Sequence, residues 1–145
     1  MIRQAGSVAI GCLEEVSFPD LGLRAIWAKV DTGAYSGAIH CTEVKVVRRA
    51  GERILKFQPS GTRPQETTNF HSTYVRSATG HRMRRHIIDT SIVIEGHTYP
   101  IHIGVSDRST MKWPVLLGRR FLREQNILVD VRINQELDDE WETAK

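Results

Sequence analysis

The sequence predicts an all-β fold, a compact barrel or sandwich. Its apolar stretches are short, rich in Val and Ile, and separated by Gly, Pro or charged residues, as in strands joined by turns. Few of them show helical periodicity. The 145 residues are 40% hydrophobic and 26% charged. This balance fits one globular domain and excludes a disordered or fibrous chain.

Eight stretches have the length and composition of strands. They are residues 8–13, 23–30, 43–47, 54–57, 87–94, 98–105, 115–117 and 127–131. The segment Glu95-Gly96-His97 predicts a hairpin turn between two of them. Turn-forming residues fill 58–69, which predicts an exposed loop, and residues 119–125 predict one short helix near the C-terminus.

The net charge of +3 conceals an uneven distribution. Residues 136–145 hold five acids and one base, which leaves about +7 on the rest of the chain. We therefore expect a single domain over residues 1–135 and an acidic tail over 136–145. A basic body can bind nucleic acid, but few aromatic residues accompany the arginines, so a stacking platform for bases is not expected.

The sequence favours a soluble cytoplasmic protein that does not bind membranes. No stretch approaches the roughly 18 apolar residues of a membrane span. The short apolar run near the N-terminus lacks the form of a signal peptide. Cys12 and Cys41 are too few for a disulfide framework, and we expect both thiols to be reduced.

Two segments carry the chemistry. Asp31-Thr32-Gly33-Ala34 ends an apolar strand, and the apolar run 115–117 ends in Gly118-Arg119. Each segment alone is common, since Asp and Gly form turns in many proteins. Their order and their spacing of about 85 residues in a β-rich chain make the pair far more specific.

Together the two segments resemble those of retropepsin-type aspartic peptidases. The chain is more closely similar to the bacterial retropepsin-like family labelled ATP-dependent zinc protease, which is associated with ATP-grasp glutamate ligases. The segments that carry the resemblance are KVDTGAYSGAIHC (29–41), VRSATGHRMRR (75–85), DRSTMKWPVLLGRRFL (107–122) and Val129-Asp130.

The resemblance implies a closed retropepsin-like barrel and a homodimer that joins two half-sites. Asp31, Thr32 and Gly33 are the expected catalytic residues, one set from each chain. Two carboxylates within hydrogen-bonding reach share one proton, so one activates water while the other protonates the peptide. Leu116, Leu117, Gly118 and Arg119 would support the site. The two Asp31 carboxylates would then titrate as a coupled pair, so neither pKa could be assigned to one of them alone.

The segment around residues 76–86 corresponds to the flap hairpin that covers the substrate in retropepsins. Its arginines predict a preference for acidic or Glu-rich peptides, because guanidinium groups bind carboxylates well. The acidic tail is then expected to occupy or screen the cleft as an internal substrate mimic. The expected substrate-binding residues are Ala34, Arg76, Ser77, Gly80, Arg82, Arg84 and Arg85.

The chain departs from the retropepsin pattern at Tyr35, where viral retropepsins have an acid that pairs with the Arg after the later Gly. Arg119 is therefore expected to lack that partner. The six histidines form no recognised zinc motif, so we expect no metal and no other cofactor.

The sequence is also compatible with other interpretations of these segments. Asp31 alone is compatible with a turn residue, and residues 76–86 are compatible with an ordinary solvated hairpin. The same fold can also act as a catalytically silent peptide-binding module. A ligase partner is implied only by the family association.

Overall fold

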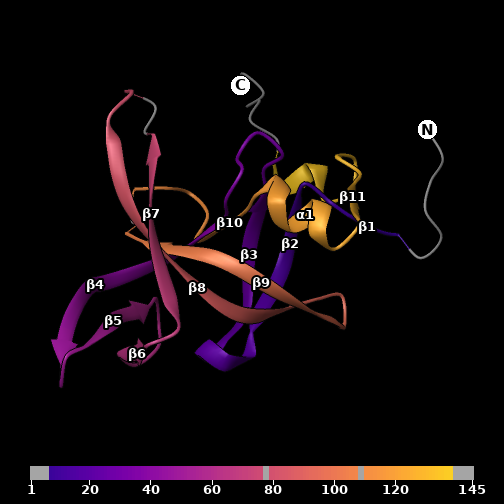
Figure 1. The fold of residues 1–145 in the computed structure, drawn as a ribbon. Helices are drawn as coiled ribbons and strands as arrows, with labels where there is room; N and C mark the ends of the chain where they lie inside the picture. The colour runs from indigo at the N-terminus through magenta and orange to yellow at the C-terminus, as the bar shows by residue number, and fades with distance from the viewer. Residues whose placement is uncertain (1–6, 77–78, 108–109, 139–145) are drawn as a thin grey trace, which may run out of the picture.

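The computed structural model describes residues 7–76, 79–107 and 110–138, and these form mostly β-structure with one short α-helix (Figure 1). The strands are β1 (Val8–Ile10), β2 (Leu13–Phe18), β3 (Leu23–Val30), β4 (Ala38–Arg49), β5 (Glu52–Pro59), β6 (Gln65–Thr67), β7 (Phe70–Arg76), β8 (Arg82–Ile94), β9 (His97–Ser106), β10 (Val115–Leu117) and β11 (Ile127–Val129). The helices are η1 (Pro19–Leu21), α1 (Arg119–Glu124) and η2 (Gln135–Leu137), of which η1 and η2 are 3-10 turns.

The main sheet follows a circuit of strand pairings. Its order runs β10, β3, β2, β8, β9, β4, and β10 also pairs with β4, so the pairings return to their starting strand. β5 and β6 continue outward from β4, and β7 forms a long hairpin with β8. Figure 1 shows this hairpin projecting away from the strands that surround the core.

The core is built mainly from β-branched and aliphatic side chains. Ile39, Ile92, Ile103 and Leu117 are fully buried, as is the aromatic ring of Phe18. Directly paired residues such as Ile88 and Ile103 both face this core, because side chains alternate between the two sides of a strand. The apolar residues of the predicted strands therefore bury one continuous core.

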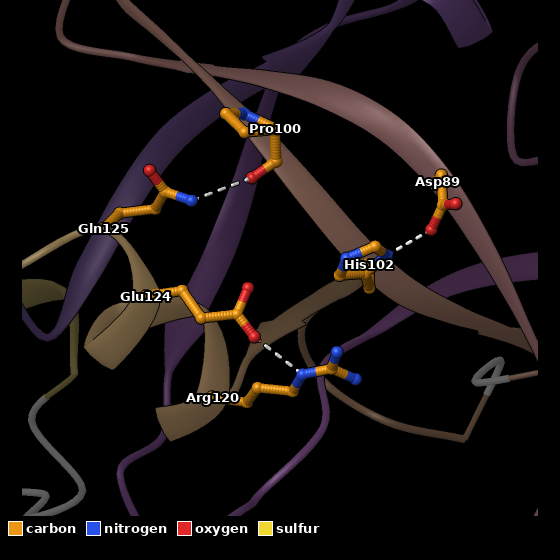
Figure 2. A network of polar contacts seen from close by, with 6 residues as sticks. All are labelled: Asp89, Pro100, His102, Arg120, Glu124 and Gln125. Atoms are coloured by element: carbon orange, nitrogen blue, oxygen red, sulfur yellow. Dashed lines mark hydrogen bonds and ion pairs between the residues drawn. The ribbon is translucent and has the colours of Figure 1, made fainter.

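Helix α1 is fixed against β9 by apolar and polar contacts. The Phe121 ring meets Tyr99 edge-on, with 5.9 Å between centroids. The Gln125 amide donates a 3.4 Å hydrogen bond to the Pro100 carbonyl, and Arg120 pairs with Glu124 one turn later (Figure 2). Nearby, His102 and Asp89 form an ion pair across β8 and β9. These contacts confirm the predicted helix and show which strand it covers.

The predicted loop over 58–69 is wrong at two places, because β5 extends through Pro59 and β6 pairs with β5. Gln65, Glu66 and Thr67 give no apolar signal because this edge strand is held by backbone pairing. The predicted strand over 8–13 is interrupted at Gly11, whose N–H donates to the Glu14 carboxylate at 2.6 Å. β2 was not predicted, since its acidic residues mask the apolar alternation.

Both cysteines are free and buried. Burial raises the pKa of the Cys41 thiol to about 12, so this thiol stays protonated at neutral pH. The start of the acidic tail is described as far as Asp138, and its remaining residues lie outside the described part. No helix of the described residues is long and apolar enough to cross a membrane.

The short strand β10 lies between β3 and β4, parallel to the first and antiparallel to the second. Its position requires close backbone approach at two glycines. A Cβ added to Gly118 would lie 2.5 Å from the Tyr35 carbonyl oxygen, and one added to Gly37 would lie 2.4 Å from that of Leu116. Both neighbours are backbone atoms and cannot rotate away.

We expect Gly118→Ala to lower the free energy of unfolding by about 3 kcal/mol, the upper end of the cost of overpacking. Gly96→Ala is the matched control, because its Cβ would meet no atom within 4 Å and only its positive φ of 78° adds strain. Urea unfolding followed by circular dichroism measures both. Equal stability of the two variants would contradict the close packing of β10.

Candidate active site

Asp31 lies at the end of β3, where the strand passes into a tight loop. Its N–H donates to the Leu117 carbonyl at 2.9 Å, and its own carbonyl accepts the Ala34 N–H at 3.2 Å. Because β3 and β10 are parallel, both end at this point and the backbone of one fixes the other. The predicted catalytic segment is thus attached directly to the predicted supporting segment.

The Asp31 carboxylate is oriented by its own loop. Its Oδ1 accepts a 2.8 Å hydrogen bond from the Gly33 N–H, and the side chain is half-buried. A Cβ at Gly33 would lie 3.1 Å from the same oxygen, which explains why glycine suits this position. Thr32 and Gly33 are exposed, so the outer edge of the loop is accessible.

Arg119 binds the loop that carries Asp31. Its guanidinium donates to the Gly33 carbonyl at 3.0 Å, and its backbone N–H donates to the Ala34 carbonyl at 2.8 Å. Its Cζ also lies 5.4 Å from the centroid of the Tyr35 ring. Arg119 therefore lacks an acidic partner at position 35, as predicted, but the Tyr35 ring takes the place of that acid as a contact of Arg119.

A cavity of about 300 Å³ opens beside Asp31. Leu116 and Trp113 provide apolar walls, while Lys29 and Lys112 bring positive charge. Asp138, the last described residue, also lines it and forms an ion pair with Lys29. The cavity is large enough for an amino-acid side chain and combines apolar and cationic walls.

The flap prediction corresponds to the hairpin of β7 and β8. Arg76 faces Arg82, and Tyr74 faces Arg84, across the two strands. Side chains alternate between the two sides of β8, so Arg82 and Arg84 lie on the same side as the core residue Ile88. The predicted residue Gly80 is exposed near the tip with φ of 85°, and Ser77 lies outside the described residues.

Arg85 lies on the opposite side of β8 from Arg82 and Arg84. Its aliphatic stem covers Gly104, where an added Cβ would be 2.7 Å from the Arg85 Cδ. Burial lowers the pKa of this half-buried guanidinium. The structure therefore places Arg82 and Arg84 together and separates Arg85 from them.

A second cavity of about 440 Å³ lies along the hairpin, between Arg53 and Arg84. Phe70, Ser72 and Tyr74 line it. The Ser72 hydroxyl is 2.7 Å from His86 Nδ1, and the pKa of His86 is lowered by burial and by the nearby charges of Arg84 and Arg53. Positive charge therefore converges on this side of the β7–β8 hairpin.

The sequence did not identify Lys29, Lys112, Trp113 or Arg53 as site residues. The sequence could have indicated Lys29, because a residue two positions before Asp31 in an extended chain lies on the same side as Asp31. Arg53 comes from a distant strand and leaves no such signal. In the described part of the chain, no three His, Cys, Asp or Glu side chains gather as a metal site.

Residues 9–138 match the model of the RimB-like family, described as retropepsin-like aspartic endopeptidase RimB. The chain belongs to this family. The resemblance drawn from the two segments around Asp31 and Gly118 is thereby confirmed.

Curated relatives include two proteins named probable alpha-L-glutamate ligase. The one from Desulfotalea psychrophila is 29% identical over 88% of this chain, and the one from Shewanella halifaxensis is 27% identical over 82%. The matches cover only 29% and 28% of those relatives, so this chain corresponds to a fraction of their length. A crystal structure of a Legionella pneumophila protein of unknown function shares the fold, with a TM-score of 0.65 and 24% identity, over 87% of this chain and 95% of that one.

We expect Arg119→Met to lower the free energy of unfolding by about 1–2 kcal/mol, because the Gly33 carbonyl loses a charged donor and Tyr35 loses its cation. Arg123→Met is the matched control, an exposed residue of the same helix. A double-mutant cycle with Tyr35→Leu should give a coupling of about 0.5–1 kcal/mol. Additive effects would show that Arg119 and Tyr35 do not interact.

Proposed function

We propose that this chain is one subunit of a homodimeric aspartic peptidase in which the two Asp31 carboxylates meet at the two-fold axis. The observation that carries the proposal is the half-buried Asp31 carboxylate, held by Gly33 and β10 at the rim of a cavity. A chain with one Asp-Thr-Gly segment supplies half of such a site. The circuit of strand pairings supports the closed barrel that retropepsins use.

Exposed apolar side chains support assembly with a second copy. Leu128 on β11 and Val131, Ile133 and Leu137 beyond it are exposed. Apolar groups clustered along one segment favour a protein–protein contact, and a two-fold dimer buries the same surface of both copies. The exposed Thr32 hydroxyl is available for a contact across the same axis.

The proposed reaction is hydrolysis of a peptide bond. One carboxylate removes a proton from water, and the resulting hydroxide attacks the carbonyl carbon. The other, protonated carboxylate gives its proton to the carbonyl oxygen. The first carboxylate then gives the proton it took from water to the nitrogen as the C–N bond breaks, and the second carboxylate takes a proton from a hydroxyl of the tetrahedral intermediate. This leaves a carboxylic acid, an amine and one proton on the pair.

We propose that the substrates are acidic or Glu-rich peptides. Arg82 and Arg84 share one side of the flap, and Arg53 adds charge at its base. The names of the relatives as glutamate ligases support a peptide that carries added glutamates, with such a ligase as a partner. Two free, buried cysteines support a location in the cytoplasm.

We expect Asp31→Asn to reduce kcat/KM for a Glu-rich peptide by about 100-fold or more, because the proton-sharing pair is lost. Asp20→Asn is the matched control, an exposed acid in η1. Peptide cleavage followed by mass spectrometry measures activity, and sedimentation velocity checks that both variants keep the oligomeric state of the wild type.

Activity retained by Asp31→Asn would contradict the proposed mechanism. A wild-type dimer that binds the peptide without cleaving it would instead favour the peptide-binding module. A monomeric wild type that remains active would contradict the shared site.

We expect the double variant Arg82→Glu and Arg84→Glu to lower the preference for acidic over neutral peptides about tenfold, because two attractive contacts become repulsive. The matched control reverses Arg24 and Arg48, which are exposed on β3 and β4 and change the net charge equally. Ratios of kcat/KM for Glu and Gln peptides give the result. An equal loss in both variants would show an effect of net charge alone.

A further inference from the structure

Lys29 lines the cavity beside Asp31. Lys29 and Asp31 point to the same side of the chain at the end of β3. Val30, which lies between them, and Ala28, which precedes them, are buried in the core. In the sheet, Lys29 stands opposite Leu13 on one side and Leu116 on the other. Neighbouring strands therefore flank Lys29 on both sides, and its side chain lines the cavity.

Lys29 is paired with an acid that is 109 residues away in the sequence. Asp138 forms an ion pair with the Lys29 ammonium, and their side chains are only 28% and 31% exposed. Asp138 also lines the same cavity as Asp31. An acidic side chain of this chain thus occupies the space beside the proposed catalytic group.

The segment that brings Asp138 to the cavity is itself held in place. Asn134 donates through its side-chain amide to the Leu13 carbonyl at 2.5 Å, and the Cys12 N–H donates to the Ile133 carbonyl at 3.2 Å. The 3-10 turn η2 follows at once, and the Asp138 N–H bonds back to the Gln135 carbonyl at 3.0 Å. The position of Asp138 is therefore set by contacts with β2 and the segment before it.

We propose that Lys29 is the residue that recognises an acidic side chain of the substrate next to the scissile bond, and that Asp138 fills this subsite when substrate is absent. This inference rests on the proposed peptidase function and assigns the specificity of its site. Trp113 and Leu116 line the cavity around the methylene groups of such a side chain, and Lys112, whose Nζ lies 5.1 Å from the Trp113 ring centroid, adds a second cation.

The occupied subsite explains how a neutral side chain is rejected. A substrate carboxylate that displaces Asp138 restores an ion pair to Lys29, so the exchange leaves the number of pairs unchanged. A neutral side chain would leave the half-buried ammonium without a partner, which is unfavourable. The tail, as part of the same chain, competes at a high effective concentration and raises the affinity that a substrate needs.

Binding measurements on the Asp31→Asn background test this assignment without hydrolysis. Fluorescence anisotropy of a labelled Glu-rich peptide and its Gln counterpart gives two dissociation constants for each variant. Lys29→Met should reduce the Glu-over-Gln preference about tenfold, since a charge-assisted contact is lost. Lys29→Arg should retain most of that preference, which separates a lost charge from a misfolded variant.

Asp138→Asn should tighten binding of the Glu peptide about three- to tenfold, because the internal competitor loses its charge. Glu136→Gln removes the same charge from an exposed residue of the same segment and is the matched control. An unchanged Glu-over-Gln ratio in Lys29→Met would overturn the role of Lys29. Equal affinities of the Asp138 and Glu136 variants, or binding of neither peptide, would also count against the subsite.

The outcome is separable from that of the proposed function. If wild type cleaves nothing but Lys29→Met loses the Glu preference, the peptidase proposal fails and the subsite stands. If cleavage depends on Asp31 but the Lys29 variants bind both peptides as before, the subsite fails and the peptidase proposal stands.

Discussion

The structure depends on the insertion of β10 between β3 and β4. The strand has only three residues, yet it pairs on both sides and completes the circuit of the main sheet. Two glycines permit this approach, since Gly37 faces the Leu116 carbonyl and Gly118 faces that of Tyr35. Side chains there would separate the strands, and the loop that carries Asp31 would lose its attachment.

That insertion also determines what surrounds Asp31. Leu117 of β10 holds the loop that carries Asp31, while the residues just before the strand, around Trp113, form the wall of the adjoining cavity. Helix α1 begins directly after the strand, so Arg119 reaches back to Gly33. One short stretch of chain therefore supplies the support, the wall and the orienting cation of the site.

The sequence predicted the parts of this arrangement whose chemistry is local. Asp31, Gly33 and Gly118 are recognisable because few residue types can serve there. β2 escaped prediction because the buried Glu14 resembles a surface residue until its bond to the Gly11 N–H is known. Contacts between distant segments, such as Lys29 with Asp138, leave no periodic pattern, so only the folded chain reveals them.

The position of β10 in the chain also governs when the site forms. Asp31 is bonded to Leu117, so a nascent chain carries its Asp-Thr-Gly segment for 86 residues before the strand that fixes it is synthesised. Pairings this distant in sequence form late, because closing a long loop costs entropy before any contact repays it. The loop that carries Asp31 therefore depends on a pairing with Leu117 that spans most of the chain, and the pairing of β1 with β11 spans a still longer stretch.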